Sequence, residues 1–589
     1  MSDPTTARVV PNLASFSVDR GFAYSIPESL AGSVTVGSIV RVPLSGRRVR
    51  GWVVELGVPA DRELREISSV SGATSVFDRR LLAALDWAAN HYVAPLSVVL
   101  AQASPPNLPR RSGSPGQTAP IESTTHPLTE ITEAAAKGHR QAAQALIGTW
   151  GDLSWLPSLT QLLSAGKTGV VVAATVAEVE RIGGALRDLG QDAVVVAGGT
   201  DAELTSAWEE LQAPGKLLIG TPRVASWQIK DLALAIVLEE GRRAMKERQT
   251  PTIHVREMIR KRSLLEGFST VFFGPTPSVE VLAAGAETTR IGNRAWPLVE
   301  VVDRAEDAPG SGFVSERVIA ALRSVVKSQG SAFMFTHRRV GLASMRCANC
   351  RTMRRCHRCG TRLGRVESCP RCSAPAGVCT NCGGSVFEEM GTVPERLVQE
   401  INGRLGGGVS GVYPEGGLVQ VGTERDLAGL PQVDLVVAAD VDGMLMSHGY
   451  RASEEALRQL ARLGNSLAPG RGRRMMVQTS QPDSELIATL RRGDPIPYLE
   501  SVLVERARDG VPPAAEMIAL EVRGDVDVDL SAELGDVGCE VMGPLTIEGG
   551  KRWLLTGDLA VARRELRPVV GRIRDGGASV RVDADPIDL

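Results

Sequence analysis

Long apolar runs and an excess of charge of either sign are missing from this 589-residue sequence, and aromatic side chains are scarce. No apolar stretch approaches the roughly 20 residues needed to cross a bilayer. The opening Met1–Pro4 lacks the basic start and apolar core of a signal peptide. Aromatic residues make up 4% of the chain and the net charge is −2, so the molecule as a whole is no polycation. We therefore expect a cytoplasmic protein with no membrane contact, in which any nucleic-acid site is local.

The chain is too long for a single core, and its apolar content of 43% is enough to bury several. Strand-like alternation dominates the start, and from about residue 150 short β-branched runs alternate with helical stretches, as in parallel sheets with crossover helices. The sequence thus predicts a multidomain α/β protein. Its expected parts are a β-rich domain with a helix (1–103), a Pro-rich linker (104–148), a first α/β lobe (149–310), a second lobe (311–345 and 385–484), an insertion in that lobe (346–384) and a small α+β domain (485–589).

Eight of the nine cysteines form four CxxC pairs. Two cysteines three residues apart at a tight turn present both sulfurs to one side, which is half of a tetrahedral zinc site. In a reducing compartment such pairs are metal ligands more often than disulfides. We predict two structural zinc ions; an iron–sulfur cluster is the less favoured alternative. Cys539 stands alone, and we expect it to be a buried apolar residue. The predicted ligands are Cys347, Cys350, Cys356, Cys359, Cys369, Cys372, Cys379 and Cys382.

Spacing alone does not fix which pairs share a metal. The connectors between consecutive pairs are five, nine and six residues long, and the longest, 360–368, has two glycines and can form a hairpin. This favours a nested arrangement. One zinc then takes Cys347, Cys350, Cys379 and Cys382, and the other takes Cys356, Cys359, Cys369 and Cys372.

Basic residues gather around the cysteines and in one turn of the first domain. Residues 346–372 hold eight arginines and a single acid, which is the electrostatic pattern of a phosphate-binding surface. The alternatives are a solvated face or pairing with acids elsewhere. Our candidate DNA contacts are Arg351, Arg354, Arg355 and Arg358 in the insertion, and Arg41, Arg47, Arg48 and Arg50 in the first domain, where a solvated hairpin is an equal alternative.

The tetrapeptide Ala165-Gly-Lys-Thr168 has the end of a phosphate-loop motif but not its setting. The full motif has a glycine where this chain has Gln161, and its lysine opens a helix. Here a Val-rich strand follows at once. We therefore reject a phosphate loop at this position.

Several short motifs resemble the PriA family of bacterial primosomal helicases, in an order that covers nearly the whole chain. The most specific are Phe22-Ala-Tyr24, Arg41-Val-Pro43, the four CxxC pairs, Ala439-Asp-Val-Asp-Gly443 and Tyr450-Arg-Ala-Ser-Glu454. The resemblance implies two RecA-like lobes of a superfamily 2 helicase, nested zinc sites, and an N-terminal domain that captures a 3′ DNA end from Phe22 onward. It also implies forked, branched and single-stranded DNA, other primosome proteins and the replicative helicase-loading machinery as partners.

The chain departs from that family where ATP would bind. No Gly-rich Walker A segment precedes Val170, the magnesium-ligand Asp is Leu238, and the family's Asp after the first-domain Phe is Ala23. The glutamine and two arginines of the last helicase motif are Leu463, Leu467 and Gly470. Loss of one arginine finger alone costs about 10³–10⁵ in rate. We expect no catalytic residues and no ATP hydrolysis, and these losses leave ATP binding in doubt.

The sequence therefore predicts a replication restart protein that recognises stalled or abandoned forks and helps to reload the replisome without helicase activity. Two alternatives stay open. One is an active ATP-dependent 3′–5′ DNA helicase with an atypical nucleotide site. The other is a zinc-ribbon scaffold that binds only protein partners.

Overall fold

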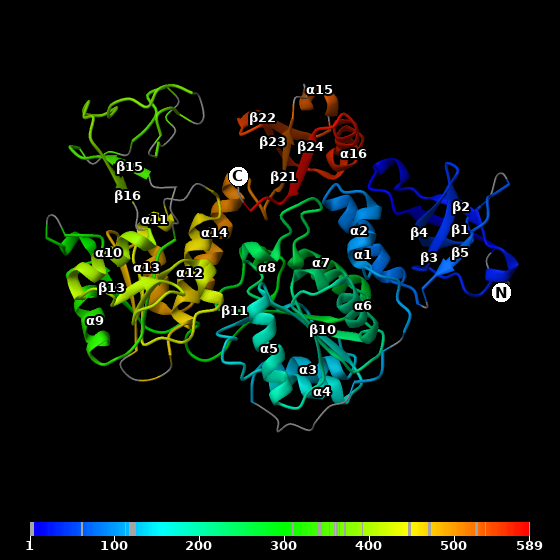
Figure 1. The fold of residues 1–589 in the computed structure, drawn as a ribbon, viewed down its shortest axis with the longest axis horizontal. Coiled ribbons are helices and arrows are strands. Elements are labelled where there is room, and N and C mark those ends of the chain that lie inside the picture. The colour runs from blue at the N-terminus through cyan, green and yellow to red at the C-terminus, as the bar shows by residue number, and fades with distance from the viewer. Residues whose placement is uncertain are drawn as a thin grey trace. The chain divides into compact units, whose positions relative to one another are not determined.

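The computed structural model describes residues 5–587 except for 60–62, 73, 112, 117–124, 309–310, 338–343, 351, 353, 359, 361–362, 365, 370–372, 391–392, 446–448, 469, 471–472, 525–527 and 536. The chain forms two compact units, one made of residues 1–291 and 505–589 and the other of residues 292–504. Their elements are labelled in Figure 1.

The first unit begins with a five-stranded antiparallel sheet of order β2-β1-β4-β3-β5. Its strands are β1 (Thr6–Pro11), β2 (Phe22–Ser25), β3 (Ile39–Leu44), β4 (Arg47–Leu56) and β5 (Ser69–Ser71). Ser45 and Gly46 join β3 to β4, and both have positive φ, which is typical of a tight hairpin turn. The helices α1 (Arg79–His91) and α2 (Leu96–Ala103) cover one face of the sheet, where Trp52 Nε1 donates to Ser104 Oγ at 3.0 Å.

The first lobe is a seven-stranded parallel sheet of order β12-β6-β11-β10-β7-β9-β8. Its strands are β6 (Gln144–Ile147), β7 (Thr168–Val172), β8 (Ala193–Val196), β9 (Leu217–Gly220), β10 (Leu232–Leu238), β11 (Ser269–Gly274) and β12 (Glu287–Arg290). The helices are α3 (Leu128–Ala136), α4 (Thr160–Ser164), α5 (Val176–Asp188), α6 (Asp201–Glu210), α7 (Val255–Glu266) and α8 (Val279–Ala283). Val170 and Val172 enter one core and Val171 the other, so the sheet is buried on both faces.

The structure differs from the predicted linker of residues 104–148. Leu128 and Ile131 of α3 are buried in the core of the first lobe, and β6 pairs with β11 inside its sheet. Ahead of them the backbone N–H of Asn107 donates to Thr205 and that of Gly113 to Glu209, so this stretch lies along α6. The Pro-rich composition predicted a linker, because composition alone does not show which parts of the chain a segment packs against.

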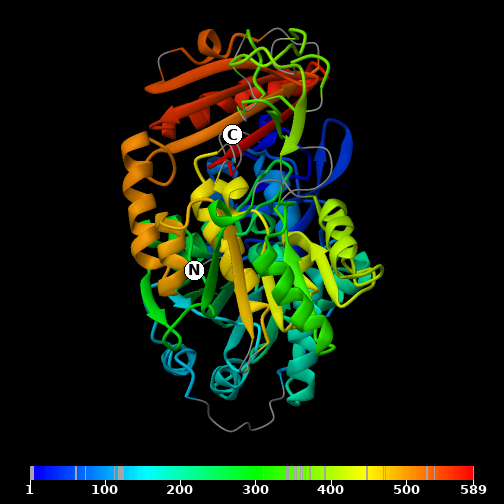
Figure 2. The same ribbon diagram turned by 90° about the vertical axis from the view of Figure 1, so that its left-hand side faces the viewer.

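The C-terminal part of the same unit is a four-stranded antiparallel sheet of order β22-β23-β21-β24. It consists of β21 (Glu516–Arg523), β22 (Cys539–Ile547), β23 (Gly550–Gly557) and β24 (Ser579–Ala584), with helices α15 (Leu530–Leu534) and α16 (Ala560–Asp575). Figure 2 shows its orange and red strands side by side. The sheet begins at Glu516, well after the predicted boundary at 485, and Cys539 on its edge strand is only half-buried.

Lys246 ties this sheet to the first lobe. Its Nζ donates to the carbonyl oxygens of Ala584 and Asp585 at 2.6 and 2.7 Å, and it lies 2.6 Å from a carboxylate oxygen of Asp583. Both charged side chains of this ion pair are buried. A fully paired cation at this depth fixes where the end of β24 packs.

Asp19 offers a test of the contact between the first domain and α16. Its carboxylate lies 3.1 Å from Arg567 and accepts from the backbone N–H of Leu96, yet burial raises its pKa to about 6. The folded state then holds this proton more tightly than the unfolded chain does, so the contribution to stability is present below pH 4 and is lost as pH rises through 6. After allowance for partial exposure we expect the wild type to lose about 1–2 kcal/mol between pH 4 and 7. The Asp19→Asn variant should lack this loss in urea unfolding, and equal pH dependence in both proteins would contradict the assignment.

The second unit holds a six-stranded parallel sheet of order β13-β20-β19-β14-β18-β17. Its strands are β13 (Val299–Asp303), β14 (Ala332–Phe335), β17 (Ser410–Val412), β18 (Val419–Gly422), β19 (Leu435–Ala438) and β20 (Arg474–Thr479). Its helices are α9 (Glu316–Lys327), α10 (Pro394–Leu405), α11 (Val441–Leu445), α12 (Ala452–Asn465) and α13 (Glu485–Arg492), and α14 (Ile496–Asp509) leads back to the first unit. β13 was expected in the first lobe and α13 in the C-terminal domain, but both pack in the second lobe.

The cysteine-rich insertion leaves this lobe between β14 and α10. Its two ends form the short antiparallel pair β15 (Ser344–Cys347) and β16 (Phe387–Met390). Two parallel lobes, an inserted cysteine module, a β-rich start and a small α+β domain confirm the predicted fold class. Among the described helices, none is both long and apolar enough to span a bilayer.

Candidate functional site

Four cysteines from the outer two CxxC pairs come together at the base of the insertion. The sulfurs of Cys347, Cys350, Cys379 and Cys382 all lie within 4.8 Å of one another. Sγ of Cys347 is 3.4 Å from that of Cys382, and Sγ of Cys350 is 3.5 Å from that of Cys379. Four sulfurs at these separations suit the tetrahedral thiolate coordination of zinc.

The β15–β16 ladder explains why the outer pairs meet. It places Cys347 directly opposite Phe387, five residues beyond Cys382. Both outer CxxC turns therefore lie next to the same end of the β15–β16 pair, and their sulfurs meet there. Gly384 lies against this point, since a Cβ there would be 3.1 Å from Sγ of Cys347.

Two of the four cysteines are shifted towards the thiolate form that zinc binds. A backbone hydrogen bond from Cys350 lowers the pKa of Cys347, and hydrogen bonds from Thr352 lower the pKa of Cys350 to about 5. A backbone hydrogen bond from Gly384 favours the Cys382 thiolate, but the neighbouring sulfurs of Cys350 and Cys347 outweigh it and raise the pKa of Cys382 to about 12. Crowding of thiolates makes the last proton hard to lose, and a bound dication would remove that penalty.

The described parts of the inner CxxC pairs have the same turn geometry as the outer pair Cys379/Cys382. In the turn that starts at Cys379, the backbone N–H of Asn381 points to Sγ of Cys379 and that of Gly383 to its carbonyl. The turn that starts at Cys356 repeats both contacts, with the N–H groups of Arg358 and Gly360. In the turn that starts at Cys369, the N–H of Ser373 donates to the Cys369 carbonyl, and Ser373, Gly360 and Gly383 all have positive φ.

Cys356 and Cys369 are buried together with Leu363 and Ala374 in a small cluster of their own. Their predicted partners Cys359 and Cys372 lie outside the described residues. The repeated turns are compatible with a second four-sulfur site, of which the structure describes two candidate ligands.

The candidate arginines of the insertion have different settings. Arg354 donates to the carbonyls of Gly364 and Ala376, and its guanidinium lies 4.7 Å from the ring centroid of Phe387. It therefore holds the module together, and we withdraw it as a phosphate contact. Arg355 and Arg358 are exposed, whereas Arg351 lies outside the described residues.

The first-domain candidates are divided between the two faces of their sheet. Arg41 pairs directly with Arg50, and Arg48 lies two residues from Arg50 on β4, so these three share a face. Phe22 lies opposite Val9 and Arg47 opposite Leu44, on the other face. The five residues therefore do not form one patch. This split follows from strand register, which the sequence does not reveal.

Burial and the charge of Arg41 lower the pKa of Arg50. Two guanidinium groups held side by side repel each other, and Arg50 Nε is buried without a hydrogen-bond partner. No carboxylate pairs with Arg41, Arg48 or Arg50 among the residues that the structure covers. An anion such as a DNA phosphate would relieve this repulsion.

The carboxyl edge of the first-lobe sheet is where nucleotides bind in open α/β folds. The loop after β6, residues 148–155, lies there between a strand and a helical segment, as a phosphate loop does. It carries Trp150 and Trp155, both buried, and Leu153 at a φ of +59°, a conformation natural to glycine. Trp155 Nε1 donates to the Trp150 carbonyl at 2.8 Å.

A buried ion-pair network fills the same edge. Trp150 Nε1 donates to Glu239 at 2.8 Å, and Arg242 pairs with Glu178 at 2.6 Å and with Glu239 at 3.7 Å. The guanidinium of Arg181 lies 4.9 Å from the centroid of the Trp150 ring. Leu238, which ends β10 at the magnesium-ligand position, is buried. Apolar rings and internal salt bridges thus fill this edge of the sheet.

Sequence reasoning missed these residues. The signal was Gly148-Thr-Trp-Gly151 directly after an apolar run, where a glycine-rich loop would stand. The rejected motif lies elsewhere, because Lys167 follows α4 and precedes β7 at the opposite edge of the sheet. That rejection is confirmed.

Comparisons with known proteins agree with the resemblance. Residues 8–105 match the family model of the PriA 3′ DNA-binding domain. The probable replication restart protein PriA of Deinococcus radiodurans is 27% identical over 73% of this chain, which spans only 53% of that relative. The probable replication restart protein PriA of Mycobacterium tuberculosis is 23% identical over 91% of this chain and 90% of its own length.

A solved DEAD box protein from Methanococcus jannaschii aligns with 62% of this chain and 88% of its own, at 11% identity and a TM-score of 0.30. At so low a score the fold assignment depends on the strand order alone. The family match at residues 8–105 and the extent of the relatives agree with what the motifs indicate: most of the chain is similar to the PriA replication restart proteins.

Proposed function

We propose that this protein binds forked or branched DNA in replication restart and does so without an ATP-driven motor. The observation that carries the proposal is a contrast within one unit. Among the residues that the structure describes, no carboxylate pairs with the first-domain arginine face, whereas the nucleotide edge of the first lobe is filled by Trp150, Trp155 and the pair of Arg242 with Glu178.

Phosphoryl transfer needs a cradle of backbone N–H groups, a lysine, a metal and an arginine near the γ-phosphate. Binding ATP at this edge would require Trp150 to leave its buried position and to break its hydrogen bond to Glu239. The departures at Leu238 and Leu463 point the same way, since neither side chain can hold magnesium or stabilise the transferred phosphate. The chain therefore keeps the architecture of a helicase lobe and uses it as a scaffold.

DNA binding is supported by the arginine face and by the cysteine module. Arg41, Arg48 and Arg50 on β3 and β4 form the first phosphate contact, and Arg355 and Arg358 of the module form a second. The module is held by two zinc ions in the nested arrangement. We place the protein in the cytoplasm, with other primosome proteins and the helicase-loading machinery as its partners.

The experiment measures fork binding by fluorescence anisotropy and ATP binding by calorimetry on one zinc-loaded preparation. We expect salt-sensitive fork binding and no detectable heat from ATP with magnesium. DNA-stimulated ATP turnover would return the protein to the active helicases. Capture of partner proteins without fork binding would make it a protein scaffold.

Reversing the charge of the arginine face should weaken fork binding. For Arg41→Glu with Arg50→Glu we expect an affinity loss of about tenfold or more. The slope of log K against log salt should fall by about 0.9 per lost contact. Arg47→Glu, on the opposite face, serves as the matched comparison. A loss as large in Arg47→Glu as in the double variant would rule out a face-specific contact.

A further inference from the structure

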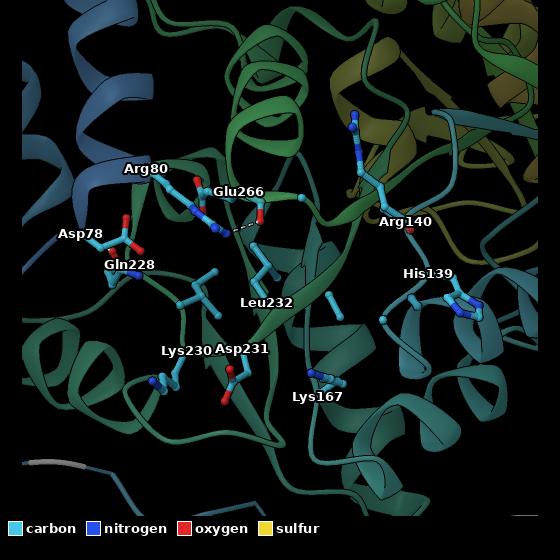
Figure 3. Close-up of a pocket in the computed structure, with 16 residues that line it drawn as sticks. Asp78, Arg80, His139, Arg140, Lys167, Gln228, Lys230, Asp231, Leu232 and Glu266 are labelled. Carbon is cyan, nitrogen blue, oxygen red and sulfur yellow. Dashed lines mark hydrogen bonds between the residues drawn. The ribbon is translucent and has the colours of Figure 1, made fainter.

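A second charged feature lies at the amino edge of the first-lobe sheet, opposite the tryptophan-filled edge. A basin of about 400 Å³ opens where β7, β10 and β11 begin. Its walls come from the start of α1, the loop after α3, the turn after α4, the turn before β10 and the end of α7. Figure 3 shows this basin with its charged side chains.

Four cations from four separate segments line the basin: Arg80, Arg140, Lys167 and Lys230. Within the described part of the chain, none of them forms an ion pair with a carboxylate, and Arg80 donates only to the carbonyl of Glu266, at 3.4 Å. Figure 3 places Lys230 at one rim and Arg140 with His139 at the other, with Arg80 and Lys167 between them. The positive charges therefore span the basin instead of gathering at one point.

Most of the acidic side chains that line the basin already accept hydrogen bonds from other groups. Both carboxylate oxygens of Glu266 accept from Arg262, at 2.6 and 2.9 Å. Asp78 caps α1 by accepting from the backbone N–H of Leu81 at 2.8 Å. Asp231 alone is left without such a partner among the described residues.

The partial charges at helix ends must be counted to find the sign of the net charge of the basin. The C-termini of α3, α4 and α7 lie at this edge, and each carries about half a negative charge. Together with Asp78 and Asp231 they oppose four full positive charges, and the first turn of α1 adds about half a positive charge. The cations still prevail by about one charge, in a molecule whose net charge is −2.

We propose that this basin binds a run of phosphate groups. A single phosphate would reach only part of it, whereas consecutive phosphates would contact Lys230, Lys167 and Arg140 in turn. The same chemistry belongs to a DNA backbone and to the polyphosphate of a free nucleotide. The site lies apart from both the nucleotide edge and the arginine face, so it does not depend on the function proposed above.

The test titrates the intact protein with inorganic tripolyphosphate at low salt by calorimetry. We expect Arg140→Glu with Lys167→Glu to weaken this binding about tenfold or more. Arg508→Glu with Arg523→Glu makes the same change in charge on exposed residues of α14 and β21 and should bind as the wild type does. The neutral variant Arg80→Gln with Lys230→Gln repeats the test should the first variant fail to fold.

Two further titrations identify the source of the phosphates. A loss of affinity for single-stranded oligothymidine in the basin variant, with competition by tripolyphosphate, supports a DNA backbone. A loss for ATP or GTP but not for oligothymidine supports a free nucleotide. Wild-type protein that binds no tripolyphosphate, or equal weakening in the control variant, overturns the site. Any heat from ATP is assigned with the same variants: heat that is lost in Arg140→Glu with Lys167→Glu comes from the basin, whereas heat that persists in this variant comes from the nucleotide edge and contradicts the proposed function. Failure of either proposal can therefore be told from failure of the other.

Discussion

Replacing Cys379 with serine is expected to remove one of two bound zinc ions and to unfold the base of the cysteine module. Cys379 supplies one of four sulfurs that lie within 4.8 Å of one another, and its carbonyl anchors Gly383 in the same turn. Structural zinc contributes about 10–16 kcal/mol to the folding of small modules at neutral pH, far more than their own cores do. Metal analysis of the purified chain should fall from two zinc ions to one.

Two comparisons make this result specific. Cys539→Ser, in the C-terminal sheet, should keep both zinc ions. Cys356→Ser should lose the other ion, and the Cys356/Cys379 double variant both. Two zinc ions retained in Cys379→Ser would contradict the outer site, and a total of one in the wild type would contradict the inner one.

The second large effect is expected at the filled nucleotide edge. Arg242→Ala should destabilise the first unit by about 3–5 kcal/mol, because it leaves Glu178 and Glu239 with less compensation for their buried charges. In a working nucleotide site the charged residues await a ligand, so their loss affects turnover more than folding. Here the charged residues at this edge pair with one another and stabilise the fold. Urea unfolding followed by tryptophan fluorescence measures the change, since Trp150 lies in the network.

Its matched control is an exposed arginine of the same lobe. Arg223→Ala removes an exposed guanidinium and should change stability by no more than about 0.5 kcal/mol. Similar losses in the two variants would show that Arg242 does not support the fold through its ion pairs. Addition of ATP with magnesium should not raise the midpoint of either variant.

The sequence predicted what local chemistry determines. The CxxC spacing indicated the cysteine turns, and the nine-residue connector favoured the nesting that brings Cys347 and Cys382 together. β-branched runs such as Val170–Val172 predicted a parallel sheet because both faces of such a strand are buried. The resemblance to PriA rested on short motifs, and the family match at residues 8–105 agrees with them.

What the sequence did not reveal depends on contacts between distant segments. Residues 128–136 looked like a linker, since their partners in the first-lobe core lie elsewhere in the chain. Counting arginines could not separate Arg354, which holds the module, from Arg355, which faces solvent. The two faces of the first sheet follow from the pairing of β3 with β4, and a shift of one residue would exchange them.

The anchor at Lys246 has a consequence for synthesis on the ribosome. Its acceptor Asp585 lies 339 residues further along the chain, and the whole second lobe is made in between. At about 5–20 residues per second this interval lasts roughly 17–70 s. During that time the second lobe can fold as a unit, while the C-terminal partners of Lys246 have not yet been made. The nascent chain can therefore complete the second unit, which is inserted in the first, before the first unit is complete.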